Sequence, residues 1–594
     1  MFRSLTFMLP IGIAIAAAAW SGQAQQFVDH TLVAAPGTAT VEPGTTIPAF
    51  LFNGQLPAPV ISGTVGQTLR VRYINQLPDT SSIHFHGLAM PAGMDGVIGV
   101  SRPGVASTQE FNYEIPLTHS GTYWYHPHVE DQMTSGLYGA IIVHPQNSAD
   151  DPQSDVDQIV ILHDQTTAAG GMLGGRMNGT APGFSAHLLN GSTSVGQTPI
   201  QIQSGQRLRL RLINAAAHTS YVVALDGHQL EVSHADGHRV QPILTSAIPI
   251  GPGERYDAIV TANNPGVWSL AAADITNRNQ VLVRGILQYA GSTGPLPAPG
   301  FVPGALATGV LLSYGQLAAF IPTVPITASP NRVHSLSLAM SMAPGGMSFT
   351  INGQAWPNVT PLAAAFGESV QFNFTNTGGM MGGGFRHPMH LHGHFMRLMG
   401  TAGGVTAPPI KDTILIRPVG QPWSSASAQI IADNPGRWAL HCHDVDHMAM
   451  GMMTVVSYGG DADSDGLPNS LDWSPNLVEA AVAIAESISA FTIGGSGFVT
   501  VQATSGSYVD LFAGLPSTSP LTVSPFGVIF LDILAMPPVH LGTIPTGGNS
   551  AALFPYGIPF NPSLLGLRIG LQAVVASPAI PIARLSQWQP LTIQ

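Results

Sequence analysis

One stretch decides how this chain is interpreted: His441-Cys442-His443-Asp444-Val445-Asp446-His447-Met448-Ala449-Met450-Gly451-Met452. It holds the only cysteine among 594 residues, so this thiol has no partner for a disulfide within the chain. Side chains alternate between the two faces of an extended strand, which would place His441 and His443 on one face and Cys442 on the other. One tripeptide can then serve two metal sites on opposite sides of a strand.

The cysteine side of this stretch predicts one kind of metal centre. Cys442, His447 and the thioether of Met452 supply most of a His₂Cys set with a weak axial methionine, which is typical of electron-transfer copper. The second imidazole must come from elsewhere in the chain, and so must partners for the two flanking histidines.

Paired histidines supply candidates for those partners. The chain has 22 histidines, from which chance would give roughly one His-x-His pair. Imidazole suits copper, so an excess of such pairs beside a copper-type cysteine favours further copper sites over scattered core or surface histidines. The four pairs are His84-Phe85-His86, His126-Pro127-His128, His390-Leu391-His392 and His441-Cys442-His443.

A threefold internal repeat indicates the domain organisation. Each copy begins with Asn-Gly and continues to a strand that alternates apolar and polar residues, at 66–75, 205–214 and 367–376. With 67 glycines, 49 prolines and only 9% charged residues, the pattern predicts three β-sandwiches built from short strands and turns. The second copy has Ser269-Leu270-Ala271-Ala272 where the others carry histidines, so it is expected to be a spacer.

The motifs together resemble those of a known family. His84-Phe85-His86-Gly87, Trp124-Tyr125-His126-Pro127-His128, His387-Pro388-Met389-His390-Leu391-His392-Gly393 and the cysteine stretch are similar to the four copper motifs of three-domain multicopper oxidases, which include laccases and bacterial cuprous oxidases. The resemblance extends from about residue 27 to residue 458. It implies an all-β fold of three cupredoxin-like Greek-key β-sandwich domains, followed by a smaller C-terminal β-rich module.

The resemblance also implies four copper ions and a position for each ligand. A type 1 copper would be held by His387, Cys442 and His447, with Met452 axial. A type 2 copper would be held by His84 and His390. The two type 3 coppers would be held by His86, His126 and His443, and by His128, His392 and His441.

The implied reaction couples oxidation of a reductant to reduction of O₂. Electrons would enter through His387 and pass along Cys442 and its neighbours to the three-copper cluster, where four electrons and four protons convert O₂ to water. Asp95 resembles the family's proton-relay acid, although an Asp-Gly pair is also an ordinary turn signal.

The reductant stays open at this stage. An axial methionine lowers the type 1 potential relative to an apolar residue, which favours an easily oxidised phenol or aromatic amine, or a metal ion. Met380 and Met381 precede His387 in a glycine-rich loop and could bind Cu(I), while packing is the alternative role. A laccase-like phenol oxidase is the first expectation, a cuprous oxidase the second, and a non-catalytic copper-binding protein the third.

The remaining segments complete the predicted organisation. Residues 1–24 are expected to be a signal peptide, 25–150, 151–300 and 301–458 the three cupredoxin domains, 459–477 an Asp-rich linker and 478–594 the C-terminal β-module. Export to the periplasm or extracellular space follows from the signal peptide, and no membrane span is expected. A net charge of −12 argues against nucleic-acid binding.

Two features of the C-terminal part carry hypotheses of their own. The linker spacing resembles a calcium loop, with a plain acidic linker as the alternative. Its candidate ligands are Asp461, Asp463, Asp465, Asn469 and Asp472. The Ala-rich segment from Leu477 to Ala490 is expected to be helical. For the C-terminal module, binding to a surface, a glycan or a protein and a stabilising role are both left open.

Overall fold

The structure is a computed structural model that describes residues 26–166, 185–343, 346–379 and 384–459, together with the strands of the C-terminal part. No helix within these residues is long and apolar enough to cross a membrane. Three predictions fall outside the described residues: the signal peptide, the calcium loop from Asp461 to Asp472, and the loop with Met380 and Met381.

The first sandwich consists of two four-stranded sheets with helical turns between them. Its elements are β1 (Phe27–Glu42), β2 (Thr45–Phe52), β3 (Ile61–Thr64), β4 (Thr68–Asn75), β5 (His84–His86), η1 (Ala92–Met94), β6 (Glu110–Pro116), β7 (Gly121–His126), α1 (Glu130–Thr134), β8 (Gly139–His144) and η2 (Ser148–Asp150). The strand orders are β2-β1-β4-β6 and β3-β8-β7-β5. In β4, Leu69, Val71 and Tyr73 point into the core between polar neighbours, as the alternating sequence predicts.

The middle sandwich has one six-stranded and one five-stranded sheet. Its elements are β9 (Val156–Thr166), β10 (Ser185–Leu189), β11 (Ile200–Ile202), β12 (Arg207–Asn214), β13 (Tyr221–Leu225), β14 (Leu230–Ala235), β15 (His238–Thr245), β16 (Ile248–Ile250), β17 (Arg255–Thr261), β18 (Val267–Asp274) and β19 (Asn277–Tyr289), followed by α3 (Gly304–Thr308) and η3 (Tyr314–Gln316). The strand orders are β10-β9-β12-β17-β14-β15 and β11-β19-β18-β13-β16.

The third sandwich repeats this plan. Its elements are β20 (Arg332–Ala343), β21 (Gly346–Ile351), β22 (Leu362–Ala364), β23 (Ser369–Gly379), β24 (His387–Leu391), β25 (Met396–Leu398), β26 (Ile410–Lys411), β27 (Thr413–Ile416), β28 (Ser425–Ile431), β29 (Arg437–Cys442), α4 (Val445–Ala449) and β30 (Met453–Tyr458). The strand orders are β21-β20-β23-β28-β25-β26 and β22-β30-β29-β24-β27.

The internal repeat is visible at atomic detail. Asn53, Asn190 and Asn352 have φ angles of 53°, 49° and 54°, and each precedes a glycine with positive φ, which is the geometry of a two-residue hairpin turn. Each asparagine side chain accepts a hydrogen bond from one backbone amide of a neighbouring strand and donates one to a carbonyl of the same strand. The strands β4, β12 and β23 that follow pair parallel with β1, β9 and β20.

Strand β12 departs from the predicted alternation because its polar face is covered. Arg209 and Arg211 are 2% and 3% exposed, and both guanidinium groups pair with the buried carboxylate of Asp257. Nη1 of Arg211 also donates to Oγ1 of Thr122 on β7, at 2.9 Å. The first sandwich therefore covers the arginine face of β12. In the equivalent strand β4 this face is open to solvent, and Arg72 is exposed.

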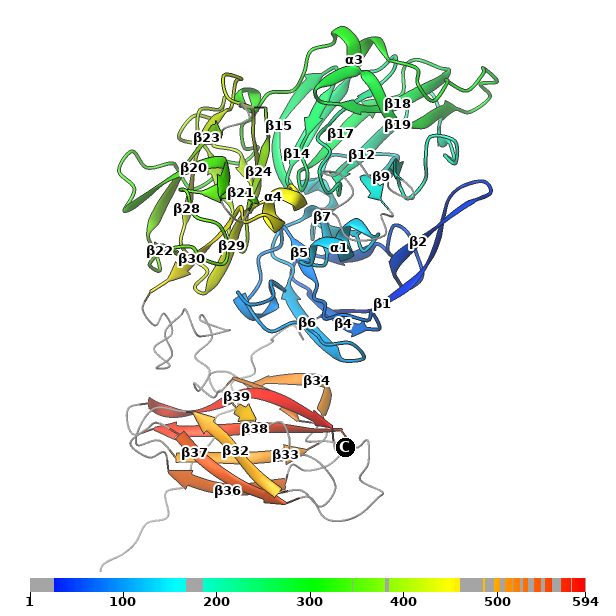
Figure 1. Cartoon of the computed structure of the whole chain (residues 1–594). Coiled ribbons are helices and arrows are strands. Elements are labelled where there is room, and N and C mark those ends of the chain that lie inside the picture. Colours follow the sequence, from blue (N-terminus) through cyan, green and yellow to red (C-terminus); the bar gives the residue numbers. More distant parts are fainter. Residues whose placement is uncertain are drawn as a thin grey trace, which may run out of the picture.

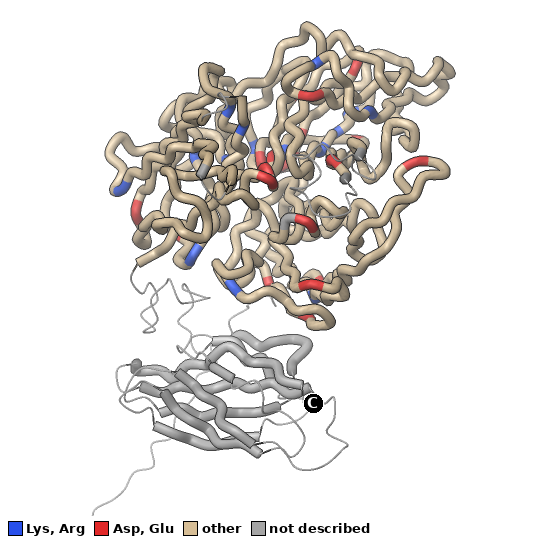
Figure 2. The backbone as a smooth tube through the Cα atoms, in the orientation of Figure 1, with Lys and Arg blue, Asp and Glu red and all other residues tan. Residues whose placement is uncertain are grey.

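The three sandwiches meet at the centre of the described part. Figure 1 shows β5, β7 and α4 close together there, with the middle sandwich above them. Val445 N donates to Ala217 O at 2.9 Å, and Asn434 Nδ2 donates to Met90 O at 3.1 Å, so the third sandwich bonds to both others. Figure 2 shows Asp, Glu, Lys and Arg spread thinly along the tube, with both signs present near this junction.

Beyond Gly459 the structure describes strand backbones. β31 (Ile484–Glu486), β32 (Ser496–Gln502) and β37 (Ala551–Gly557) form one sheet, and β33 (Tyr508–Gly514), β36 (Val539–Pro545), β38 (Arg568–Ser577) and β39 (Ile580–Thr592) form another; β34 (Pro516–Val523) pairs with β35 (Gly527–Leu531). The prediction of a β-rich C-terminal part is confirmed. The helix expected from Leu477 to Ala490 is wrong at Ile484–Glu486, because these residues pair with β32, and pairing overrides local propensity.

Candidate metal centre

Cross-strand pairing brings the histidine motifs together. His84 on β5 lies opposite His126 on β7, and His390 on β24 lies opposite His441 on β29. β5 and β7 belong to the first sandwich, whereas β24 and β29 belong to the third. Each of these sandwiches therefore brings a neighbouring pair of histidine-bearing strands to the common junction.

One group of ligand-type atoms lies within the third sandwich. Sγ of Cys442 is 3.5 Å from Nδ1 of His447 and 3.8 Å from Nδ1 of His387. The two nitrogens are 3.3 Å apart, and all three side chains are buried. Two imidazoles and one thiol that converge in this way are the donor set of an electron-transfer copper site.

The local fold of the cysteine stretch explains this convergence. The stretch is not extended throughout: β29 ends at Cys442, Asp444 caps the short helix α4 by accepting from His447 N at 3.3 Å, and β30 follows. The turn returns His447 towards Cys442. Met452 is bound to both residues through its backbone, since its N donates to His447 O at 2.9 Å and its O accepts from Cys442 N at 3.0 Å.

A second, larger group of histidines lies between the first and third sandwiches. Nε2 of His84 and Nε2 of His390 are 3.4 Å apart. Nε2 of His441 lies 3.3 Å from Nε2 of His128 and 3.1 Å from Nε2 of His392. The pairs His84–His390 and His128–His441 join the first sandwich to the third, and His392–His441 lies within the third, so the group exists only in the assembled fold.

The last three histidines complete this group. The ligand atoms of His86, His126 and His443 all lie within 4.8 Å of one another. Nδ1 of His86, Nε2 of His126 and both ring nitrogens of His443 are buried without a hydrogen-bond partner among the described residues. Unsatisfied buried nitrogens are costly, and a bound cation would satisfy them.

The hydrogen bonds of the outer ring nitrogens test whether a cation fits. Nδ1 of His84 and Nδ1 of His390 each lie 2.9 Å from a backbone carbonyl, of Asp95 and Asp412 respectively, and must donate there. Their Nε2 atoms then both carry lone pairs and face each other. Two lone pairs at this distance repel, whereas a cation between them would bind both.

The same logic holds on the other side of the cluster. Nδ1 of His441 donates to Cys442 O at 2.9 Å, and Nδ1 of His392 donates to the Asp95 carboxylate at 2.9 Å. The Nε2 atoms of these two rings are therefore acceptors that face each other. The residues present thus fit a set of bound copper ions.

Burial and mutual proximity determine the protonation states of the donor side chains. The pKa of His390 lies well below its ordinary value because the ring is buried and next to His392. Burial, with the neighbouring His447, lowers the pKa of His387 to about 3. Burial raises the pKa of the Cys442 thiol, so this group must release a proton when a cation binds. Neutral imidazole is the form that binds metal.

Asp95 lies inside this cluster and also forms a turn. Its side chain is fully buried, and its two oxygens lie 2.9 and 3.0 Å from Nδ1 of His392; Oδ1 is 3.2 Å from Nδ1 of His84. It ends η1, and the following Gly96 has a φ of 81° with no room for a side chain against the Ile83 carbonyl. Asp95 therefore both forms a turn and contacts the histidines of the site.

Small pockets reach the cluster from two sides. One is lined by histidines of the cluster and by Met133, Val445 and Met448. The other is lined by His84, His390 and Asp412, with Leu88 and Phe395. Space for a molecule as small as water therefore lies next to the cluster at both places.

Two contacts of the site have no counterpart in the sequence motifs. Asp412 accepts from His86 Nε2 through Oδ1 at 3.0 Å, and His218 of the middle sandwich places Nδ1 3.1 Å from Oδ1 of Asp444. Neither residue stands at a recognisable spacing from a ligand. The middle sandwich, expected only as a spacer, supplies no member of the metal-type groups within the described residues, yet it contacts their supporting residues.

Comparison with known proteins identifies the family. Sequence models described as multicopper oxidase match residues 34–148, 162–292 and 328–461. The chain is 32% identical to multicopper oxidase MmcO of Mycobacterium tuberculosis over 471 residues, which cover 71% of this chain and 87% of that protein. It is also 32% identical to laccase-4 of Thanatephorus cucumeris over 448 residues, covering 67% and 83%.

Solved structures agree on the fold. Fet3p, a multicopper oxidase that functions in iron import, superposes with a TM-score of 0.65 at 20% identity, over 76% of this chain and 94% of that one. The laccase from Botrytis aclada gives 0.62 at 24% identity, over 73% and 88%. This chain belongs to the multicopper oxidase family, the copper-dependent oxidoreductases that use O₂ as electron acceptor.

Proposed function

We propose that this protein is a laccase-like enzyme that oxidises a phenol or aromatic amine at a type 1 copper and reduces O₂ to water at a three-copper cluster. The observation that carries the proposal is the pair of facing Nε2–Nε2 contacts, His84 with His390 and His392 with His441, which a bound cation would stabilise. Copper supplies the redox chemistry when bound, because it takes up one electron at a time.

Each copper position has its proposed ligands in the chain. His387, Cys442 and His447 would hold the type 1 ion, with Met452 as the proposed weak fourth ligand, and His84 and His390 would hold the type 2 ion. The two type 3 ions would be held by His86, His126 and His443, and by His128, His392 and His441. The convergence of these groups supports the assignment.

The chain also provides a covalent route between the two sites. Cys442 belongs to the type 1 group, and its sequence neighbours His441 and His443 belong to the cluster. Asp95 orients His84 and His392, and we assign it the relay of protons to the cluster, because its carboxylate contacts the outer nitrogens of both rings.

A metal-ion oxidase is the second candidate, and one observation favours it. His387, through which electrons would enter, is fully buried, and its Nε2 has no hydrogen-bond partner among the described residues. A bulky phenol would have to deliver its electron through covering atoms. A small ion such as Cu(I) needs less room at the surface.

Export and the C-terminal functions belong to the same proposal. The apolar run after Arg3 supports a cleaved signal and a periplasmic or extracellular location. Calcium binding by the Asp-rich loop and attachment through the C-terminal module rest on the sequence alone.

Oxygen uptake by the copper-loaded mature protein tests the proposal. Turnover of a methoxyphenol without added copper would support the laccase function. Turnover with Cu(I) alone, or phenol turnover that needs excess Cu(II), would move the role to metal oxidation. A loaded protein that consumes no O₂ with either reductant would leave copper binding as its function and contradict the oxidase proposal.

A further inference from the structure

One residue outside the histidine motifs contacts ligands from both sandwiches. The backbone carbonyl of Asp412 accepts from Nδ1 of His390 at 2.9 Å, and its carboxylate accepts from Nε2 of His86 at 3.0 Å. His390 therefore presents Nε2 to the cluster, while His86 presents Nδ1, which is buried without a hydrogen-bond partner in the described part of the chain. Asp412 thus selects a different ligand atom in each ring.

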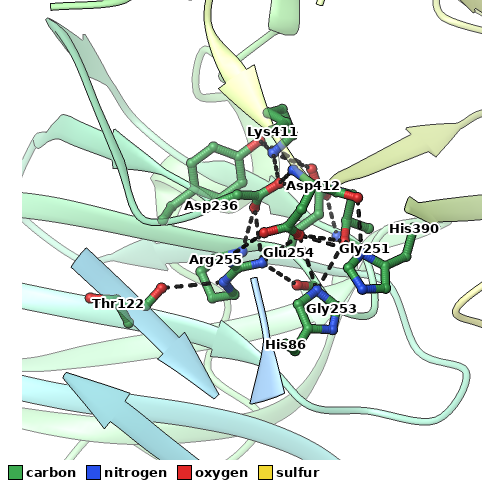
Figure 3. A network of polar contacts seen from close by, with 12 residues as sticks. His86, Thr122, Asp236, Gly251, Gly253, Glu254, Arg255, His390, Lys411 and Asp412 are labelled. Atoms are coloured by element: carbon green, nitrogen blue, oxygen red, sulfur yellow. Dashed lines mark hydrogen bonds and ion pairs between the residues drawn. The ribbon is translucent and has the colours of Figure 1, made fainter. Parts of the chain in front are cut away.

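Asp412 is itself held by the middle sandwich. Arg255 on β17 donates from Nη1 to Oδ1 of Asp412 at 2.7 Å and from Nη2 to Oδ2 at 2.6 Å. Figure 3 shows this guanidinium between Asp412 and the strand that carries Thr122, whose carbonyl accepts from Nε of Arg255 at 3.3 Å. A paired fork of this kind fixes the plane of the carboxylate as well as its position.

Two glycines leave room for this pair and for the ligand rings beside it. A Cβ at Gly87, directly after the His84–His86 strand, would lie 2.3 Å from Nη2 of Arg255 and 2.7 Å from Oδ2 of Asp412. A Cβ at Gly253 would lie 3.0 Å from the ring of His443 and 3.1 Å from that of His86. Glycine at both positions lets the middle sandwich approach the ligand rings directly.

A further layer of charges holds the backbone around Asp412. Asp236 accepts through Oδ2 from the amides of Asp412 and Thr413, at 3.2 and 3.1 Å, and pairs with Nζ of Lys411 at 3.0 Å. Lys411 also pairs with Glu254 at 2.9 Å. The five charged residues of this network, Arg255, Lys411, Asp236, Glu254 and Asp412, are at most 1% exposed.

We propose that Asp412, held by Arg255, is a positioning residue that fixes the ring orientations of His86 and His390. By this route the middle sandwich, which offers no ligand of its own among the described residues, sets the geometry of the type 2 copper and of one type 3 copper. The inference rests on the ligand assignment proposed above. It assigns a function to the middle sandwich that the ligand motifs do not contain.

The test compares two variants with the wild-type protein, each loaded with copper. Arg255→Lys replaces the fork by a single ammonium, and Asp412→Asn places an amide against Arg255 or turns it away from His86. We expect each to weaken retention of cluster copper against a chelator by about 10- to 100-fold, the usual effect of losing an outer partner of a ligand. The type 2 electron paramagnetic resonance signal and the near-ultraviolet band of the type 3 pair should decline.

The visible band of the type 1 copper provides an internal control, because its ligands do not touch Arg255. It should keep its wild-type intensity per chain in both variants, which also shows that the third sandwich is folded. Arg209→Lys is the matched control: Arg209 is 2% exposed, and its side-chain hydrogen bonds go to Asp257, Asp151 and His234, none of which is a proposed ligand. It should leave cluster copper unchanged.

Each remaining outcome has one meaning. Wild-type retention and spectra in both test variants would overturn the positioning function. Equal loss of cluster copper in Arg209→Lys would overturn it as well, because general loosening of the sandwich would then explain the effect. A wild-type protein that takes up no copper would contradict the proposed function instead, and is distinguished by the absence of every copper signal.

Discussion

The two proposed copper centres differ in how many parts of the molecule build them. The proposed type 1 group is drawn from one sandwich, and two of its three proposed main ligands, Cys442 and His447, lie in one strand–helix turn. The cluster takes its histidines from the first and third sandwiches. Its supporting carboxylate Asp412 belongs to the third sandwich, and the guanidinium of Arg255 that holds this carboxylate belongs to the middle sandwich. Folding of one sandwich can build the first centre, whereas only assembly of all three sandwiches builds the second.

The largest effect is expected from breaking the link between the two centres. Cys442→Ser removes the thiolate ligand and should abolish the visible type 1 band and reduce O₂ uptake to background, because a serine oxygen is a poor substitute for a soft thiolate. Cluster copper should be retained, since its histidines stay in place. Copper analysis with absorption and resonance spectra checks this; undiminished turnover would refute the electron route.

Acidification should destabilise the copper-free protein, and most of the rings responsible belong to the cluster. Burial and neighbouring imidazoles lower the pKa of six cluster rings well below 6.5: His86, His126, His128, His390, His392 and His443. Below pH 6.5 the unfolded chain therefore binds protons that the folded chain does not. Well below pH 6.5, each such ring lowers the unfolding free energy by at most about 1.4 kcal/mol per pH unit as the pH falls.

Denaturant unfolding of copper-free protein between pH 7.5 and pH 5 measures this effect, with the pH values chosen to bracket the ordinary histidine pKa of about 6.5. Stability should be level above that value and fall below it. Replacing His128 by glutamine, which stays neutral, should make the slope shallower. A stability that rises on acidification would contradict the arrangement of neutral, closely packed rings.

Asp95→Asn should separate proton delivery from electron entry. We expect O₂ reduction to fall by about 100-fold, within the range for loss of a positioned acid or base, while reduction of the type 1 copper keeps its rate. Anaerobic stopped-flow and steady-state uptake compare the two steps. Asp29→Asn, at a carboxylate that is 64% exposed and paired with Arg70, is the control and should leave both unchanged. Equal losses in both steps would argue for general damage.

The smallest effect is expected at the cap of the type 1 helix. Asp444→Ala removes the side chain that accepts from His447 N and should cost about 1 kcal/mol of stability. The type 1 band should shift or weaken because His447 is carried by α4, and the cluster spectra should stay as they are. A spectral change confined to the cluster would contradict the expectation that Asp444 supports only the type 1 site.

Much of the fold was predictable because it rests on short-range patterns. The Asn-Gly turns at Asn53, Asn190 and Asn352, each followed by an alternating strand, predicted the threefold repeat that the hydrogen bonds display. The prediction of a solvent-facing side failed where another sandwich packs against the strand. Arg209 and Arg211 have the pattern of a solvent-facing edge, yet the first sandwich covers them, and no local signal reports such coverage.

By itself the sequence determined which side chains could bind copper. The His-x-His spacings, the lone cysteine and Met452 follow from residue type and from the alternation of a strand, which act over a few residues. Tertiary structure decided which nitrogen each ring presents and what holds it there. Asp412 contacts His86 across 326 positions of the chain, and Arg255 joins them from the middle sandwich. Such contacts depend on how separate sandwiches pack, and no periodicity or spacing within one strand encodes that.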